Sequence, residues 1–226
     1  MANRRNGAGA AGLRGAVFDL DGTLLDSMRV WEEVDAAFLR ECGVAVPKDL
    51  SERLKILNFE ECVMYFINTL GVKRTKEEIL TRIGAMTRAA YRTDAVTAKP
   101  FVRDALGGLR ERGVTMCVAT ANDYDVTMET LERLGLSEYF AFAVTCGQLG
   151  CSKTQPDIYR HCAARLGTTP EETMVAEDAL HCVRAARDAG FYVVGVYDDS
   201  TPAGDSAEIK ALSDQYITSW KEGITL

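Results

Sequence analysis

Residues 15–27 read GAVFDLDGTLLDS, and this stretch carries the clearest structural signal in the chain. It opens with the short apolar run of residues 15–20, which is typical of a buried strand in a parallel sheet. Asp19 and Asp21 end that run two positions apart, so in an extended chain their side chains point to the same side. Because ligands bind beyond the C-terminal ends of parallel strands, the stretch predicts a strand with a site at its end.

The rest of the chain repeats this alternation of strand and helix. Four further apolar runs predict strands, at residues 114–121, 141–146, 173–176 and 192–197. Helical patterns precede or separate these runs, and each pattern stops at a glycine. Residues 169–172, TPEE, match a capping box with proline at the first helical position. The alternation predicts the α/β class, a doubly wound parallel sheet with helices on both faces.

Residues 28–98 break this alternation. They hold helical patterns and no strand-like run, which predicts a separate helical domain inserted after the first strand. The α/β core domain would then comprise residues 1–27 and 99–226, and the two linkers would form a hinge. Residues 1–12, MANRRNGAGAAG, contain two arginines and then small residues, and we expect them to form a disordered tail.

Composition and charge limit the classes of function. The net charge of −7 argues against nucleic-acid binding, which needs a basic surface. No stretch approaches the roughly 18 apolar residues of a membrane span, and the N-terminus lacks the apolar segment of a signal peptide. Seven cysteines without a CxxC pair indicate reduced thiols. We therefore expect a cytoplasmic protein without nucleic-acid or membrane partners, and the oligomeric state is left open.

Polar residues follow the first four predicted strands in turn. In chain order the candidate site residues at these ends are Asp19 and Asp21, then Thr120, Ala121 and Asn122, then Lys153, and finally Glu177 and Asp178. Close carboxylates repel one another unless a cation or a shared proton compensates, and all-oxygen ligands suit Mg²⁺. Lys153 and the Thr120 hydroxyl supply donors for an anion. Acids and a metal beside such donors predict a phosphoryl-transfer site.

Each of these residues by itself has a more ordinary interpretation. An isolated DxDG is usually a turn, and a lysine before a helix is usually solvated. Thr120 could cap the following helix, and Glu177 with Asp178 could complement a helix dipole. Four such groups in order, each at the end of a predicted strand, favour a functional site over these alternatives.

The same motifs resemble a known family. FDLDGTLLDS at 18–27, ATAN at 119–122, SKTQPDIY at 152–159 and VAEDALHCVRAARDAG at 175–190 are similar to the motifs of the haloacid dehalogenase superfamily. The resemblance is closest to the branch with a helical cap, which includes small-molecule phosphatases and β-phosphoglucomutase. It implies a Rossmann-like core, with residues 28–98 as the cap.

The resemblance also implies a role for each residue. Asp19 would be the nucleophile that forms an aspartyl-phosphate, and Asp21 the acid and base. Thr120, the amides of Ala121 and Asn122, and Lys153 would bind the phosphoryl group. Mg²⁺ would be held by Asp19, the main-chain carbonyl of Asp21, Asp178 and Glu177, the last directly or through water.

Within the family, Asp21 favours hydrolysis of phosphate monoesters, because dehalogenases and phosphonate-cleaving relatives lack this second aspartate. β-Phosphoglucomutases carry a histidine near the position of Trp31 and a loop with glycine and arginine that residues 50–59 do not clearly show. A sugar phosphomutase and a non-catalytic binder of a phosphorylated ligand stay as alternatives.

The expected substrate is a small phosphorylated metabolite whose identity does not follow from the sequence. In this family the cap contributes to specificity. The side chains of the cap that could contact the substrate are Trp31, Arg53, Lys55, Asn58, Tyr65 and Arg88.

Overall fold

The computed structural model describes residues 12–54 and 59–225, and the chain forms two compact units. The core unit comprises Met1–Asp26 and Thr97–Leu226, and the helical unit comprises Ser27–Val96. The helical unit overlaps the predicted insertion, and its independent folding stays a prediction. The predicted disordered tail, apart from Gly12, lies outside the described residues.

The core unit is built on a six-stranded sheet in the order β5-β4-β1-β6-β7-β8, with every neighbouring pair parallel. Its strands are β1 Gly15–Phe18, β4 Thr115–Thr120, β5 Phe140–Thr145, β6 Thr173–Glu177, β7 Tyr192–Val196 and β8 Gln215–Ile217. The five predicted strands are confirmed, with small shifts at their ends. Strand β8 was not predicted, because three residues of mixed polarity give no recognisable apolar run.

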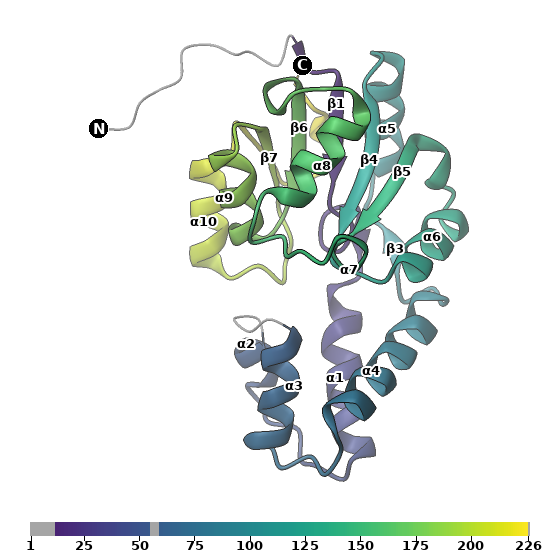
Figure 1. Ribbon diagram of the computed structural model, residues 1–226, viewed down its shortest axis with the longest axis vertical. Coiled ribbons are helices and arrows are strands. Elements are labelled where there is room, and N and C mark those ends of the chain that lie inside the picture. The colour runs from purple at the N-terminus through teal and green to yellow at the C-terminus, as the bar shows by residue number, and fades with distance from the viewer. Residues whose placement is uncertain (1–11, 55–58, 226) are drawn as a thin grey trace. The chain divides into compact units, whose positions relative to one another are not determined.

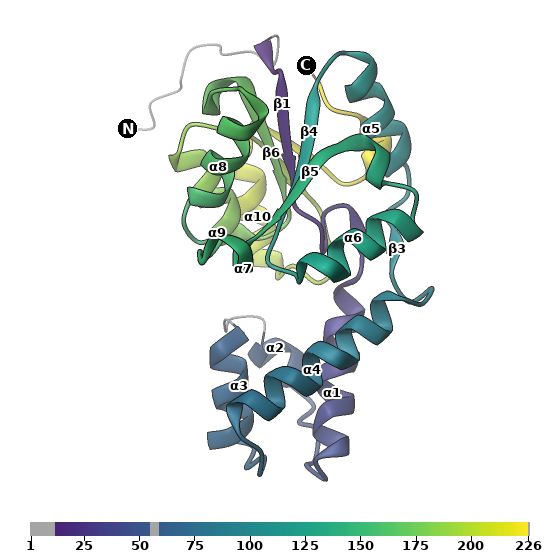
Figure 2. The ribbon, with the colours of Figure 1, turned by 45° about the vertical axis from the view of Figure 1, so that its right-hand side comes forward.

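Helices cover both faces of this sheet, as Figures 1 and 2 show. Helices α8, α9 and α10 lie on one face, and α5 and α6 lie on the other. The helices are α5 Val102–Glu111, α6 Tyr124–Arg133, the short α7 Cys146–Leu149, α8 Asp157–Leu166, α9 Leu180–Asp188 and α10 Ala203–Leu212. The described part of the core unit also contains the 3₁₀ turns η2 Ser137–Tyr139, η3 Pro170–Glu172 and η4 Trp220–Glu222. The predicted α/β class is therefore confirmed, and the TPEE capping box opens η3.

Alternating side chains of the central strand serve the two faces, as the pleat of a strand requires. Val17 lies in one apolar cluster with Cys117 and with Ile158 of α8. Phe18 points the other way, with its ring 5.9 Å from that of Trp220. All five side chains that make up these contacts are at least 97% buried, so β1 is held from both sides and the residue that follows it is fixed in space.

A second, two-stranded antiparallel sheet lies where the chain leaves and re-enters the core unit. It pairs β2 Leu25–Asp26 with β3 Thr97–Ala98. The N–H of Lys99, just after β3, donates to the carbonyl of Leu24 at 2.8 Å. The two predicted linkers therefore run side by side here, and strands of two residues are too short to leave a sequence pattern.

The helical unit contains α1 Met28–Glu41, α2 Leu50–Leu54, α3 Phe59–Asn68 and α4 Lys76–Tyr91. Apolar residues at helical spacing, such as Val30 and Val34, are buried on one face of α1. The rings of Phe38 and Phe66 lie 5.9 Å apart and join α1 to α3. A capping box at Thr75 fixes the start of α4. The helical patterns predicted for this region are confirmed.

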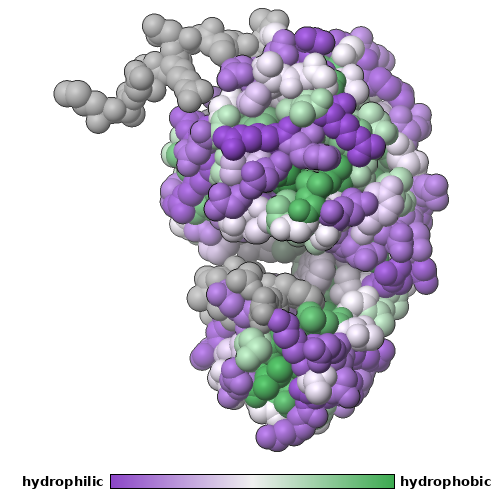
Figure 3. All heavy atoms as spheres, viewed as in Figure 1, coloured by the Kyte–Doolittle hydropathy of each residue, from purple (hydrophilic) through white to green (hydrophobic). Residues whose placement is uncertain are grey.

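The visible surface of each unit is mostly hydrophilic, with smaller hydrophobic areas between the polar residues (Figure 3). Among the described residues, no helix has the length and apolar character that a membrane crossing requires.

Candidate active site

The C-terminal ends of three adjacent strands meet at one edge of the core sheet. Asp19 follows β1, Thr120 ends β4, and Glu177 ends β6 with Asp178 directly behind it. The N–H of Asp19 donates to Ala176 of β6 at 3.0 Å, which keeps the end of β1 beside that of β6. Parallel register thus brings together side chains that are more than 150 residues apart in the chain.

Three carboxylates gather at this edge. Asp19, Glu177 and Asp178 are buried, and a carboxylate oxygen from each lies within 4.8 Å of the others. Lys153, which follows α7, is also buried and pairs through Nζ with both Asp19 and Glu177. The site therefore holds three carboxyl groups against one ammonium group.

The pKa values of these groups reflect burial first and the neighbouring charges second. Burial, and then the charge of Asp19, raises the pKa of Glu177 to about 7 against the opposing effect of Lys153. Burial and the charges of Asp19 and Glu177 raise the pKa of Asp178 well above its usual range. Burial alone would lower the pKa of Lys153, but Asp19 and Glu177 hold it well above its usual value, so the ammonium stays charged.

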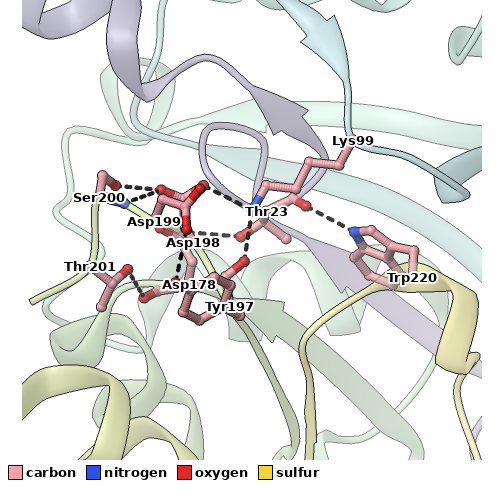
Figure 4. A network of polar contacts seen from close by, with 9 residues as sticks. All are labelled: Thr23, Lys99, Asp178, Tyr197, Asp198, Asp199, Ser200, Thr201 and Trp220. Carbon is pink, nitrogen blue, oxygen red and sulfur yellow. Dashed lines mark hydrogen bonds and ion pairs between the residues drawn. The ribbon is translucent and has the colours of Figure 1, made fainter. Parts of the chain in front are cut away.

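Several hydrogen bonds fix these acids in place. The Thr23 hydroxyl donates to Asp178 Oδ1 at 2.9 Å, and the carbonyl of Thr23 accepts from the indole N–H of Trp220 at 3.0 Å (Figure 4). The Tyr159 hydroxyl donates to Glu177 Oε1 at 2.8 Å. Gly22 has a φ of +81°, and a Cβ there would lie 2.8 Å from Asp178 Cγ. Only glycine both adopts this turn and leaves room for Asp178.

On the β4 side of the site, Asp21 and Asn122 are in contact. The Asn122 amide nitrogen Nδ2 donates to Asp21 Oδ2 at 3.0 Å, so Asp21 has partners different from those of Asp19. The backbone N–H of Asn122 donates to the Thr120 hydroxyl at 3.0 Å and would have to change partner to bind a phosphoryl group. Asp123, not Thr120, caps α6, since its side chain accepts from the first turn of that helix.

The donor set fits a hard divalent cation. Buried carboxylate oxygens within reach of one another are the ligands that Mg²⁺ prefers, and Lys153 offers them one positive charge. Glu177 already contacts Lys153 and Tyr159, so it is the least available of the three carboxylates for direct binding of a metal ion.

The residues expected to contact a substrate from the cap lie in the helical unit where they are described. Arg53 pairs with Asp49 at 2.7 Å, and the Trp31 ring lies 6.2 Å from that of Tyr91. Tyr65 and Arg88 are half-buried on α3 and α4. Lys55 and Asn58 lie outside the described residues.

Sequence reasoning missed the residues that support the site from other elements. Tyr159 on α8 has the pattern of a core residue, and its hydrogen bond to Glu177 is visible only in three dimensions. Thr23 follows the DxDG motif, and nothing in the sequence indicates that its hydroxyl contacts Asp178. Thr201, whose hydroxyl donates to the carbonyl of Asp178 at 3.4 Å, stands in a loop without any motif.

The chain matches the family of haloacid dehalogenase-like hydrolases over residues 16–196. It is 27% identical to a phosphorylated carbohydrates phosphatase of Thermotoga maritima, over 79% of this chain and 82% of that protein. It is also 27% identical to hexitol phosphatase A of Escherichia coli, over 92% of this chain and 95% of that protein. The crystal structure of CbbY from Rhodobacter sphaeroides in complex with phosphate matches with a TM-score of 0.77, over 93% of this chain and 96% of that chain. The sequence identity is 21%, so this match supports the fold alone.

These matches confirm the resemblance, the fold class and the expectation of a hydrolase related to phosphatases. The family match covers most of the chain and includes every residue of the predicted site. The chain belongs to the haloacid dehalogenase-like hydrolases.

Proposed function

We propose that the protein is a Mg²⁺-dependent phosphatase that hydrolyses a phosphate monoester of a small metabolite through an aspartyl-phosphate on Asp19. The observation that carries the proposal is the buried cluster at the strand ends, where Asp19 lies between two further carboxylates and the ammonium of Lys153. A nucleophilic carboxylate beside a fixed positive charge is what phosphoryl transfer to an enzyme requires.

In the first step, an Asp19 carboxylate oxygen forms a bond to phosphorus while the bond from phosphorus to the ester oxygen breaks. Asp21, in its protonated form, gives its proton to the departing alcohol. Lys153 and the Thr120 hydroxyl balance the charge on the phosphoryl oxygens. Asn122 orients the Asp21 carboxyl through the 3.0 Å contact.

In the second step, Asp21, now ionised, accepts a proton from water. The water oxygen bonds to phosphorus, the bond between phosphorus and Asp19 breaks, and inorganic phosphate leaves. Asp21 thus regains the proton it gave, and Asp19 returns to a carboxylate. The two aspartates need different surroundings for these roles, and Asp19 is buried against Lys153 whereas Asp21 is half-exposed beside Asn122.

Asp19, Asp178 and the main-chain carbonyl of Asp21 would hold Mg²⁺, with Glu177 acting through water because Lys153 and Tyr159 already engage it. When bound, the ion would lower the charge repulsion between the substrate phosphate and the carboxylates. The relatives named for phosphorylated carbohydrates and hexitols favour a sugar or polyol phosphate as substrate class. Residues of the helical unit, with Trp31, Tyr65 and Arg88 among them, are the candidates for choosing it.

The test is turnover of an aryl phosphate with and without Mg²⁺, by the wild type and by Asp19→Asn. We expect Mg²⁺-dependent release of phosphate by the wild type and its loss in the variant. Acid quenching should trap an acid-stable, hydroxylamine-sensitive phosphoprotein in the wild type alone. Asp157→Asn, which changes an exposed acid at the start of α8, is the matched control and should stay active.

Turnover by Asp19→Asn at the wild-type rate would disprove the assignment of the nucleophile. A wild type that binds phosphorylated ligands but releases no phosphate would show a binding protein instead. Interconversion of glucose 1-phosphate and glucose 6-phosphate without net release of phosphate would show a mutase.

A further inference from the structure

The loop that follows β7 is tied to the point where the chain re-enters the core unit (Figure 4). Lys99 Nζ donates to the carbonyl of Tyr197 at 2.8 Å and pairs with Asp198 Oδ2 at 2.8 Å. Only 14% of the Lys99 side chain and 9% of the Asp198 side chain are exposed. A pair so far removed from water loses hydration on both partners, so its geometry has to be well fixed for it to persist.

Asp198 organises the loop on its own side. Its Oδ1 accepts from the N–H of Ser200 at 2.8 Å and from the Ser200 hydroxyl, and its main-chain carbonyl accepts from the N–H of Thr201 at 3.1 Å. The Thr201 hydroxyl then donates to the carbonyl of Asp178 at 3.4 Å. The loop therefore connects the ion pair to the main chain of a proposed metal ligand.

Lys99 reaches the same ligand by a second route. Its backbone N–H donates to the carbonyl of Leu24 at 2.8 Å. The neighbouring residue, Thr23, donates its hydroxyl to the Asp178 carboxylate at 2.9 Å. Asp178 is thus held at its main chain through the loop and at its side chain through the turn after β1, and both routes meet at Lys99.

We infer that Lys99 and Asp198 form a positioning pair that fixes Asp178 for cation binding, although neither residue contacts the reacting groups. The inference rests on the proposed Mg²⁺ site. Because the charge of Lys99 offsets that of Asp198, the contribution that we assign to the pair is the geometry of the loop and of the turn after β1. Partners behind a ligand commonly change metal affinity or activity about 10-fold to 100-fold when they are replaced.

The experiment measures Mg²⁺ affinity by calorimetric titration of the full chain, which needs no turnover. Lys99→Met and Asp198→Asn should each raise the dissociation constant about tenfold. The double variant should raise the dissociation constant no further, because either single change already breaks the same ion pair. The control pair is Arg184 with Glu208, an exposed ion pair between α9 and α10, and Arg184→Met should leave the affinity unchanged.

Single variants that bind Mg²⁺ within twofold of the wild type would overturn the inference. Tighter binding by Lys99→Met would also overturn it, because the pair would then act through charge. If Lys99→Met does not fold, the nearly isosteric Asp198→Asn decides alone. Phosphatase turnover by the wild type tests the proposed function separately, so an active enzyme with unaffected variants refutes only the positioning pair.

Discussion

The two units of the molecule keep carboxylates away from water in different ways. In the core unit, burial and then the charge of Asp19 raise the pKa values of Glu177 and Asp178, and the charge of Glu177 raises that of Asp178 further. In the helical unit, burial raises the pKa of Asp35 on α1 to about 7. Burial, and then the charge of Asp35, raises the pKa of Cys62 to about 11.

The causes of the raised pKa values distinguish a functional site from an acid that is merely buried in a helix packing. A raised pKa with several charged groups as its cause requires side chains from different elements to converge, which is typical of functional sites. A raised pKa caused by burial needs only a polar residue on a packed helix.

The largest effect should come from removing the cation of the core cluster. In Lys153→Met, the buried carboxylates of Asp19 and Glu177 lose their ammonium partner, and the substrate phosphate loses a positive charge. We expect kcat for an aryl phosphate to fall about a thousandfold. The metal-free variant should unfold at a lower temperature than the wild type, and Mg²⁺ should raise its unfolding temperature by more than it raises that of the wild type.

Lys210→Met, at an exposed position over the ring of Tyr216, is the control and should change neither quantity. If Lys153→Met keeps a tenth or more of the activity, the core cluster is not a phosphoryl-transfer site of the proposed kind.

The second-largest effect on activity should come from replacing a glycine, and a glycine in each unit allows the comparison. Gly22 in the core unit has a φ of +81° and faces Asp178, whereas Gly43 after α1 has a φ of +71° and open space around it. In both alanine variants the left-handed backbone should lower the free energy of unfolding by about 1 kcal/mol. Only Gly22→Ala also displaces Asp178, so we expect about a hundredfold loss of activity that added Mg²⁺ partly restores.

Activity assays over a range of Mg²⁺ concentrations, with urea unfolding of both variants, check this pair. Equal losses of activity in Gly22→Ala and Gly43→Ala would mean that backbone strain, and not the position of Asp178, sets the activity.

The sequence predicted the core unit well because a buried parallel strand is a short continuous apolar run and its end is marked by a change to polar residues. Asp19, Thr120 and Glu177 stand at such ends, whereas Lys153 comes eight residues after the end of β5 and beyond α7. Strand β8 and helix α10 have no comparable signal, since β8 has three residues and Ile209 is the buried apolar residue of α10.

The supporting residues could not be predicted for a different reason. Tyr159, Asp198 and Thr201 act through neighbours that are far away in the sequence or belong to another element. Lys99 stands where the predicted insertion ends, and nothing in the sequence indicates a role for its side chain. A motif records which residue types stand near one another along the chain, but these contacts depend on which strands are adjacent in the sheet.

The smallest effect should come from Asp35, whose ionisation should change the free energy of unfolding and not the activity. Its pKa is about 7 in the folded protein and 3.8 when it is exposed, so the folded state binds the extra proton. Stability is therefore lost as the pH rises from about 4 to about 7. The shift corresponds to roughly 4 kcal/mol at full burial, and the partly exposed side chain should realise about 1–2 kcal/mol of this.

Asp35→Asn should thus be more stable than the wild type at pH 8, and the gain should shrink towards pH 5. Urea unfolding at both pH values measures it, with Asp49→Asn as the control. Arg53 lowers the pKa of Asp49 through a hydrogen bond, so that variant should gain nothing as the pH rises. A gain from Asp35→Asn that is equal at pH 5 and pH 8 would mean that Asp35 is not a buried titrating acid, and the contrast between the two units would then rest on the core cluster alone.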